Sequence, residues 1–559
     1  MTQKDLPWIK SYPPEVSFDV DTRPFENLND LFDYVVRRYA DKTAYINMSG
    51  HISYENLAVE VEYFAAFLQK YCKLKKGDRL AIMMPNLIQY PIALFAALKA
   101  GLTVVNINPL YTPRELGTQL ADCKADAIVV IANYAFNLQK VIGQTRIRHV
   151  IVTGVGDALG FFRGRLVNFM VRSVLKMVPK FIMPNSISFK KALRIGSQLT
   201  LDPVLNRYDD IAFLQYTGGT TGKPKGAELT HGNIIANISE LLAYYGSVVD
   251  RGQETVVTAL PLYHIFAMTV NCMLFFAIGA TNILITDPRR IKDFIKELKH
   301  HPDISIFTGV NTLFNALLNH PDFEHVALGR LRLVIGGGAA VQSGVAQRFK
   351  ARTGLNILEG YGLTECSPVC SVCPYTAKEY TGSIGLPLPG TYARIIDADD
   401  NEIWDLNTPG ELEIKGPQVM KGYYHNEEDT KKVMHDGYVR TGDIAVWLEG
   451  GYIKIIDRLK DMILVSGFNV FPSEIEDVVS KFDKVLECAA IGVKSDKTGE
   501  AIKLFVVKRD PSVTAEEIKD YCRSYLTPYK IPHIVEFTND LPKSAIGKVL
   551  RRRLRTEAK

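Results

Sequence analysis

Apolar and polar positions in the first part of the chain alternate between helical and extended patterns. Residues 28–40 (LNDLFDYVVRRYA) and 89–100 (QYPIALFAALKA) predict helices, and a further helix is expected near 54–71. Short apolar runs at 79–86 and 103–109 predict strands. Strand, helix and strand in this order indicate parallel sheets that are covered by helices.

The pattern changes after Tyr452, where a strand runs into the charged stretch 457–461 (DRLKD), followed by another short strand and a helix. We therefore expect two domains, residues 1–457 and 458–559, with a hinge near 457–461. The expected fold class is α/β. It comprises a large N-terminal domain of parallel sheets with helices, plus a β-rich subdomain, and a small C-terminal α+β domain.

Residues 265–286 contain no charged side chain and are numerous enough to span a bilayer. Asn271, Gly279 and Asn282 interrupt the apolar character of this run. We interpret it as a buried helix, a glycine stop and a short strand, in preference to a membrane span.

The strongest local charge bias lies in residues 161–181 (FFRGRLVNFMVRSVLKMVPKF), where basic and apolar residues alternate at near-helical spacing. No acidic residue occurs between Asp157 and Asp202. Such a segment can lie on an anionic membrane surface, or it can be a helix that packs on the main domain with its charges solvated. The pattern slightly favours the packed helix.

Composition narrows the classes of partner. The chain has 559 residues, which suggests roughly three or four folding units. Its net charge of +5 is small for this length, so nucleic acid is not an expected partner. The N-terminal residues lack the apolar core of a signal peptide, and the C-terminal RTEAK carries no targeting address. We expect a cytoplasmic protein whose eight cysteines are thiols.

Residues 216–226 (YTGGTTGKPKG) form a loop rich in glycine, threonine and lysine, which suits a phosphate. The loop departs from the ordinary P-loop, because Gly218 lies one residue too close to Gly222 and Lys223. Pro224 also replaces the hydroxyl that a P-loop uses to reach Mg²⁺. A magnesium ligand is therefore expected elsewhere in the chain.

Five further motifs follow this loop: LPLYHIF (260–266), GYGLTE (360–365), RTGD (440–443), DRLKDMI (457–463) and LPKSAIGKVLRR (541–552). Each motif is weak alone. In this order and spacing, the chain resembles the adenylate-forming superfamily, which includes acyl-CoA synthetases, luciferases and the adenylation domains of peptide synthetases. Residues 436–460 are similar to the signature segment of fatty acyl-CoA synthetases.

The resemblance implies a two-step reaction in which a long-chain fatty acid is activated by ATP to an acyl-adenylate, with release of pyrophosphate, and then transferred to coenzyme A, with release of AMP. The implied cofactors are ATP, Mg²⁺ and coenzyme A. A mobile C-terminal domain is also implied. The oligomeric state stays open, a homodimer included.

The resemblance also implies roles for particular residues. The phosphates of ATP are expected on the loop residues Tyr216, Thr217, Gly218, Gly219, Thr220, Thr221, Gly222, Lys223, Lys225 and Gly226. Glu365, together with Thr217, is expected to hold Mg²⁺, since a hard carboxylate oxygen suits this ion. Tyr361 is expected against adenine, with Gly362 and Thr364 beside it.

Further roles concern the sugar, the acid and the hinge. Asp443 is expected to accept hydrogen bonds from the ribose hydroxyls, and Arg458 to contact the same nucleotide. His264 is placed beside the carboxylate by the resemblance, and Lys548 is the expected catalytic cation between two anions. Lys460 is the expected hinge. The acyl chain is expected to run past residues 265–270 and 336–338.

Rival interpretations of the same residues remain open. Cys366, Cys370 and Cys373 match the spacing of radical enzymes that bind an iron–sulfur cluster and S-adenosylmethionine, although three small buried cysteines are a simpler interpretation. A fatty-acid-binding protein without catalysis is disfavoured by Glu365, Asp443 and Lys548. Within enzymes, the acyl group could be transferred to a carrier protein, or the substrate could be a medium-chain or aromatic acid. The absence of a fused carrier domain after Lys548 favours free coenzyme A.

Overall fold

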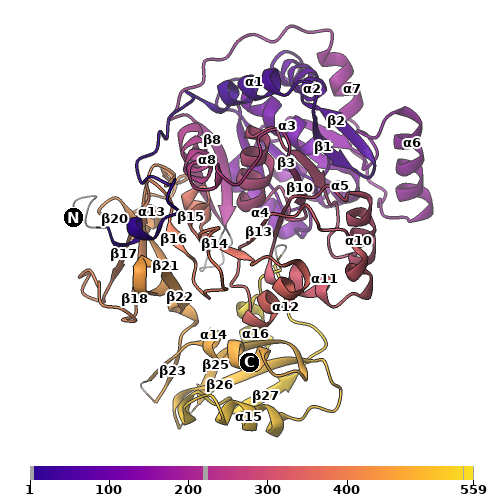
Figure 1. Ribbon diagram of the computed structural model, residues 1–559. Helices are drawn as coiled ribbons and strands as arrows, with labels where there is room; N and C mark the ends of the chain where they lie inside the picture. The colour runs from indigo at the N-terminus through magenta and orange to yellow at the C-terminus, as the bar shows by residue number, and fades with distance from the viewer. Residues whose placement is uncertain (1–5, 218–223, 467, 496, 545–546, 558–559) are drawn as a thin grey trace.

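The computed structural model describes residues 6–217, 224–466, 468–495, 497–544 and 547–557. Within these residues the strands form four sheets. Three of them belong to a large body with many helices, and the fourth belongs to a small C-terminal body (Figure 1). The expected α/β class is confirmed.

The first sheet of the large body has the order β19-β9-β8-β4-β3-β5-β6-β7. Its strands are parallel from β8 to β7, whereas β9 and β19 are antiparallel to their neighbours. The bounds are β3 (Arg79–Met83), β4 (Thr103–Asn106), β5 (Ala127–Ile131), β6 (His149–Thr153), β7 (Ile187–Ser188), β8 (Ile211–Thr217), β9 (Lys225–Thr230) and β19 (Gly422–Tyr423). The helices along this part of the chain are α3 (Gln89–Lys99), α4 (Pro113–Cys123), α5 (Ala135–Gln139) and α7 (Phe189–Gly196).

The second sheet has the order β16-β15-β14-β13-β12-β10-β11-β1-β2 and is parallel from β14 to β1. Its strands are β1 (Thr43–Asn47), β2 (Gly50–Ser53), β10 (Thr255–Thr258), β11 (Thr281–Leu284), β12 (Ile306–Gly309), β13 (Leu333–Gly336), β14 (Leu358–Gly362), β15 (Val369–Val372) and β16 (Leu386–Pro387). The accompanying helices are α1 (Leu28–Arg38), α2 (Tyr54–Ala66), α8 (His231–Tyr245), α10 (Ile291–His300), α11 (Asn311–Leu318) and α12 (Ser343–Thr353).

The predicted helices and strands occur with shorter bounds. Helix α1 begins after Asn27, whose side chain accepts hydrogen bonds from two backbone N–H groups of the first turn. The helix expected near 54–71 is α2 followed by a π-helical turn, η3 (Phe67–Tyr71).

The run 265–286 is a buried π-helix, η7 (Ala267–Leu274), a turn of α-helix, α9 (Phe275–Ala277), and strand β11. Among the described residues, no helix combines the length and apolar character needed to cross a bilayer.

A third, antiparallel sheet supplies the expected β-rich part. Its strands are β17 (Tyr392–Ile396), β18 (Gly410–Lys415), β20 (Met434–His435), β21 (Tyr438–Trp447) and β22 (Ile453–Arg458), with helix α13 (Glu427–Val433) before β20. β22 ends at Arg458, and a short 3-10 turn, η11 (Leu459–Asp461), leads into the small C-terminal body. The change from one sheet to the next therefore falls at the charged stretch 457–461.

The small body has its own sheet and its own apolar core. The strands are β23 (Ile463–Val465), β24 (Phe468–Val470), β25 (Val485–Ser495), β26 (Gly499–Lys508) and β27 (Ile534–Phe537), with helices α14 (Pro472–Ser480), α15 (Ala515–Arg523) and α16 (Arg551–Glu557). Ile475, Leu504 and Ile518 are buried in a cluster that contains only residues of this body. Figure 1 shows it below the large body, joined through β22 and β23.

The basic segment contacts the large body but leaves much of its apolar surface exposed. Residues 161–181 begin with helix α6 (Phe161–Phe169) and a π-helical turn, η6 (Met170–Val174), which project from the side of the large body (Figure 1). Gly164 is the buried residue of α6, whereas Phe162 is 85% exposed and Leu166 59%. Val167 and Val171 are nevertheless partly buried against the main core, and the basic side chains are exposed, so the segment rests on the large body with its charges solvated while several large apolar side chains stay exposed.

Candidate active site

A cavity of about 1600 Å³ lies where the large and small bodies meet. It is lined from the large body by the ends of β8 and β14, the turn 263–266 and β21, and from the small body by residues around Lys548. The predicted residues that line it are Tyr216, Thr217, Lys225, His264, Tyr361, Gly362, Thr364, Glu365, Arg458, Lys460 and Lys548. Motifs spread over more than half of the sequence thus meet in a single space.

The glycine–threonine loop connects β8 to β9. Six of its predicted phosphate-binding residues lie outside the described residues: Gly218, Gly219, Thr220, Thr221, Gly222 and Lys223. The flanking strands pair Tyr216 with Gly226 and Thr217 with Lys225, so the loop leaves and re-enters the sheet at the cavity.

Two side chains that flank the loop have partners in the protein. Lys225 Nζ lies 2.8 Å from Asp429 Oδ2 of α13 and 5.2 Å from the ring centre of Tyr423. The hydroxyl of Tyr216 donates a hydrogen bond to Asp122 at the end of α4. Sequence patterns did not predict these contacts, because the partners come from distant elements. The charge of Lys225 is already paired.

Tyr361, Asp443 and Arg458 form a connected group on one side of the cavity. Tyr361 Oη donates to Asp443 Oδ2 at 2.6 Å, and Arg458 Nε lies 3.0 Å from Asp443 Oδ1. The antiparallel register of β21 and β22 puts Asp443 directly opposite Arg458. Burial opposes the charge of Arg458, but the carboxylate of Asp443 holds the pKa of Arg458 above its usual value. An ionised Asp443 retains lone pairs that can accept further hydrogen bonds.

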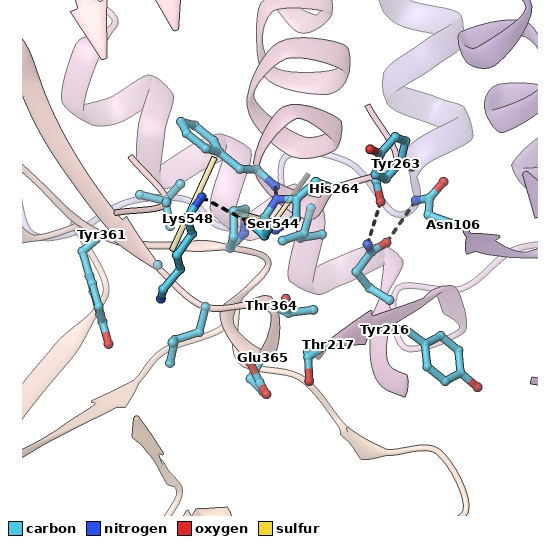
Figure 2. Close-up of a pocket in the computed structure, with 18 of the residues that line it drawn as sticks. Asn106, Tyr216, Thr217, Tyr263, His264, Tyr361, Thr364, Glu365, Ser544 and Lys548 are labelled. Atoms are coloured by element: carbon cyan, nitrogen blue, oxygen red, sulfur yellow. Dashed lines mark hydrogen bonds between the residues drawn. The ribbon is translucent and has the colours of Figure 1, made fainter. Parts of the chain in front are cut away.

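Glu365 lies in a short 3-10 turn, η9 (Thr364–Cys366), at the cavity wall. Tyr423 Oη donates to Glu365 Oε1 at 2.6 Å, and the backbone carbonyl of Glu365 accepts from Met420 N at 2.7 Å. These two bonds fix the turn, and within the described residues the second carboxylate oxygen has no hydrogen-bond partner. Thr217 and Glu365 lie near each other in the view of Figure 2.

Among the described residues, no group of three His, Cys, Asp or Glu side chains could hold a metal ion. The structure therefore does not support a metal site made by protein ligands alone. Cys366, Cys370 and Cys373 are buried free thiols, so the described residues do not support the iron–sulfur interpretation. Mg²⁺ usually takes one or two carboxylates plus phosphate oxygens and water. Glu365 offers one such carboxylate at the cavity wall.

His264 is held by the turn that precedes helix η7. Its backbone N–H donates to Pro261 O at 2.9 Å, and its Nδ1 accepts from Phe266 N at 3.4 Å. Burial, followed by the nearby charge of Lys548, lowers the pKa of His264 to about 4. The imidazole is therefore neutral near pH 7.

Buried amide side chains behind this turn escaped the sequence analysis. Gln215 Nε2 donates to Tyr263 O at 2.9 Å, and Asn106 Nδ2 donates to Gln215 Oε1 at 3.0 Å (Figure 2). Gln215 directly precedes Tyr216, so one side chain joins the strand of the phosphate loop to the turn that carries His264. An amide directly after the apolar run IAFL (211–214) was the available signal.

Lys548 reaches the cavity from the small body. Ser544 N donates to Lys548 O at 2.7 Å, and Lys548 N donates to Ser544 Oγ at 3.2 Å, which fixes the backbone turn. In the view of Figure 2 the side chain extends between Tyr361 and Thr364. Burial, followed by the charge of Arg458, lowers the pKa of Lys548 to about 8. Lys460, in η11, also lines the cavity, and burial and Arg458 lower its pKa.

Apolar residues extend the cavity away from these charges. Phe266 and Val270 line it from one side, and Leu241 and Tyr245 of α8 from another. A Cβ atom on Gly337 would lie 2.8 Å from the ring of Phe266, so the glycine permits a close approach there. The π-helical winding of η7 occurs where this apolar part is formed, and π-helical turns are frequent at functional sites.

Comparison with known families and structures covers most of the chain. Residues 32–424 match the AMP-binding enzyme family, and residues 474–548 match the AMP-binding enzyme C-terminal domain. The chain belongs to the AMP-binding enzyme family. Its site residues lie within those two matched parts, apart from Asp443, Arg458 and Lys460, which lie between them.

Relatives of this AMP-binding enzyme align over nearly its whole length. It is 51% identical over 552 residues to the long-chain-fatty-acid–CoA ligase of Escherichia coli O157:H7, covering 99% of this chain and 98% of the relative. Identity to the Bacillus subtilis (strain 168) protein of the same name is 36%, with the same coverage. The crystal structure of ATP-bound MatB from Rhodopseudomonas palustris has a TM-score of 0.81 at 27% identity, covering 95% of this chain and 99% of that one.

Proposed function

We propose that this AMP-binding enzyme is a long-chain-fatty-acid–CoA ligase that uses ATP and coenzyme A. The name rests on relatives that are 51% and 36% identical over 99% of the chain. The observation that carries the chemistry is that Lys548, Glu365 and Arg458, the ion-pair partner of Asp443, line one cavity with an apolar extension. Binding of a fatty acid alone needs no such set of charges.

In the first step, a carboxylate oxygen of the fatty acid attacks the α-phosphorus of ATP and pyrophosphate leaves. Lys548, with a pKa of about 8, is mostly protonated near pH 7 and offers its ammonium group to the two anions that must approach each other. We put neutral His264 beside the carboxylate of the fatty acid. Because its imidazole carries no positive charge, it does not form an ion pair that would make the attacking oxygen less reactive.

The nucleotide is held by the group described above. Asp443 accepts hydrogen bonds from the ribose hydroxyls, and Arg458 pairs with that carboxylate and orients it. Tyr361 packs against the adenine. We assign the outgoing phosphates to the loop 217–226. Mg²⁺, when it is bound by Glu365 and Thr217, neutralises phosphate charge.

In the second step, the thiol of coenzyme A attacks the acyl carbon and AMP leaves with the bonding electrons. We place the boundary of the mobile domain at 457–461 and the hinge at Lys460, because β22 ends at Arg458 and the next sheet begins at Ile463. A turn at this hinge withdraws Lys548 and brings another face of the small domain to the adenylate.

Residues 161–181 are proposed to contact an anionic membrane surface. Phe161, Phe162, Leu166 and Phe169 of α6 are 61%, 85%, 59% and 59% exposed, which is unusual for large apolar side chains on one short helix. All five basic side chains of the segment are also exposed. Apolar residues that enter a bilayer, flanked by cations that meet its headgroups, explain both observations.

The test of the function is a pyrophosphate-release assay across fatty acids of increasing length, with and without coenzyme A. We expect the highest kcat/KM with long chains and acyl-CoA formation only when coenzyme A is present. Higher kcat/KM with medium-chain or aromatic acids would assign a different substrate class. Adenylation without transfer to free coenzyme A would instead indicate a carrier protein as the acceptor.

A further inference from the structure

Asp457 and Arg458 are neighbours on β22 whose side chains point to opposite faces of the strand, as alternation requires. Arg458 faces the nucleotide side and pairs with Asp443. Asp457 faces the small domain, and its side chain is buried, with 5% of the residue exposed. The last strand before the hinge therefore carries one residue for each body.

Asp457 caps a helix that belongs to the other side of the hinge. Helix α14 begins at Pro472, and its own N-cap residue, Phe471, supplies no side-chain hydrogen bond. Asp457 Oδ2 accepts from Ser473 N at 2.9 Å and from Ser473 Oγ at 2.9 Å. The hydroxyl of Ser473 also lies within hydrogen-bonding distance of Ile456 O. An otherwise uncapped helix N-terminus is thus satisfied by a carboxylate from the large domain.

The capped helix is linked to Lys548 through one ion pair. Glu476 lies one turn after Ser473, and both of its carboxylate oxygens accept from Arg551 Nη2, at 2.8 and 2.7 Å. Arg551 is the first residue of α16 and follows Lys548 by three positions. The position of α14 against β22 therefore also constrains the segment that carries the ammonium group of Lys548.

We propose that Asp457 and Ser473 are positioning residues that hold the small domain in the arrangement with Lys548 in the cavity, and that this contact breaks when the domain turns for the second step. The inference rests on the proposed two-step function and on a hinge at Lys460. The two residues lie on either side of that hinge, only 16 positions apart, so a rotation between them separates the carboxylate from the helix.

The experiment compares the two half-reactions in Ser473→Ala, which removes the hydroxyl bond to Asp457, and in Asp457→Ala, which removes the capping carboxylate. Adenylation is followed by ATP–pyrophosphate exchange, and transfer by thioester formation from supplied acyl-adenylate and coenzyme A. Loss of a helix cap shifts an equilibrium by about fivefold, so we expect the ratio of adenylation to transfer to fall by about that factor. The ratio responds whichever arrangement predominates in the wild-type protein.

Ser480→Ala is the matched control, since Ser480 lies on the same helix and its hydroxyl donates to Asp477 O, within the small domain. It should leave the ratio unchanged, and Ser473→Thr, which keeps the hydroxyl, should stay close to wild type.

Trypsin cleavage after Arg458 or Lys460 should become faster in Ser473→Ala and stay unchanged in Ser480→Ala. Equal losses in both half-reactions, or an unchanged ratio with unchanged cleavage, would overturn the proposal. Failure of the wild-type protein to exchange pyrophosphate would instead refute the proposed function.

Discussion

Asp443 and Arg458 face each other across the antiparallel strands β21 and β22, with Arg458 Nε 3.0 Å from Asp443 Oδ1. The second carboxylate oxygen of Asp443 accepts from Tyr361 Oη. The acid is therefore oriented from two sides by the protein itself. Preorganisation of this kind lowers the cost of ordering the site when nucleotide binds.

Arg458→Ala should raise the KM for ATP by about tenfold or more, because it removes one of two groups that orient Asp443 and leaves a buried carboxylate less well compensated. Steady-state kinetics of adenylation at fixed fatty acid measure the effect. Arg394→Ala is the matched control. Arg394 Nε lies 2.6 Å from Glu413 Oε2 in the same sheet, and this variant should not affect the KM for ATP. An unchanged KM in Arg458→Ala would contradict the assignment.

The sequence predicted those features of the fold and the site that depend on residues close together in the chain. Helix 89–100 and the strand after it were predicted because their apolar periodicity and the following glycine are local signals. Asp443 and Arg458 were predicted only as members of motifs. Their pairing depends on the register of β21 and β22, which no pattern in the sequence states.

Lys548→Ala should slow adenylation by about a hundredfold or more, the scale expected when a charge that stabilises a transition state is removed. Thioester formation from supplied acyl-adenylate should persist, since the small domain has turned by then. The melting temperature should be unchanged, because Lys548 lies on a connecting segment and not in an apolar core. Equal losses in both half-reactions would mean that Lys548 acts in both arrangements.

Adenylation should lose activity as the pH rises through about 8. Burial and the charge of Arg458 lower the pKa of Lys548 to about 8, and the charged form is the active one, so activity is present below this pH and lost above it. The profile of kcat/KM for adenylation reports the free enzyme. Lys548→Arg should retain some activity without this alkaline decline, since guanidinium stays charged. His264, with a pKa of about 4, should add no transition between pH 6 and pH 8.

Neutralising the basic side chains of the projecting segment should weaken binding to anionic vesicles. The variant replaces Arg163, Arg165, Arg172, Lys176 and Lys180 by glutamine, and co-sedimentation with phosphatidylglycerol vesicles measures binding at rising salt. Each cation near such a surface contributes about 1 kcal/mol, and the attraction is screened by salt. Adenylation of a soluble fatty acid should remain unchanged, because none of these residues lines the cavity.

The control for this experiment neutralises the same number of exposed lysines elsewhere: Lys73, Lys75, Lys124, Lys421 and Lys431. These changes should leave vesicle binding unaffected. Phe162→Ser with Leu166→Ser should reduce binding even at low salt, since apolar area then no longer enters the bilayer. Binding that survives both the charge and the apolar changes would exclude this segment as the contact.

The sequence favoured a helix packed on the main domain in that segment, but it did not predict which residues make the contact. Helix α6 meets the large body through Gly164, where a Cβ atom would lie 2.1 Å from Gly156 O, and through Asn168, whose amide donates to Asp157 Oδ1 at 2.9 Å. Helical periodicity cannot state whether an apolar face has a partner. The lack of acidic residues between Asp157 and Asp202 was the better sequence signal that much of this surface is exposed.

Gly547→Ala should impair adenylation by obstructing the approach of the two domains. Gly547 has φ +75°, a conformation that alanine adopts at a cost of about 1–2 kcal/mol. A Cβ atom there would also lie 2.2 Å from Thr312 Oγ1 on α11 of the large domain. Because the next residue is Lys548, displacement at this contact moves the ammonium group out of place. We expect adenylation to fall by about tenfold or more, measured by pyrophosphate exchange.

A double variant separates the clash from the backbone strain. In Gly547→Ala with Thr312→Ala, the Oγ1 atom is gone and the new methyl group meets the Cβ of residue 312 at 3.4 Å, which is an ordinary contact. The strain at positive φ is the same in both variants, so any recovery of adenylation measures the clash alone. Transfer from supplied acyl-adenylate should not fall in any of these variants, since the two residues separate when the domain turns. If Thr312→Ala restored nothing, the loss would come from the backbone of Gly547, and the domain contact at Thr312 would not control the position of Lys548.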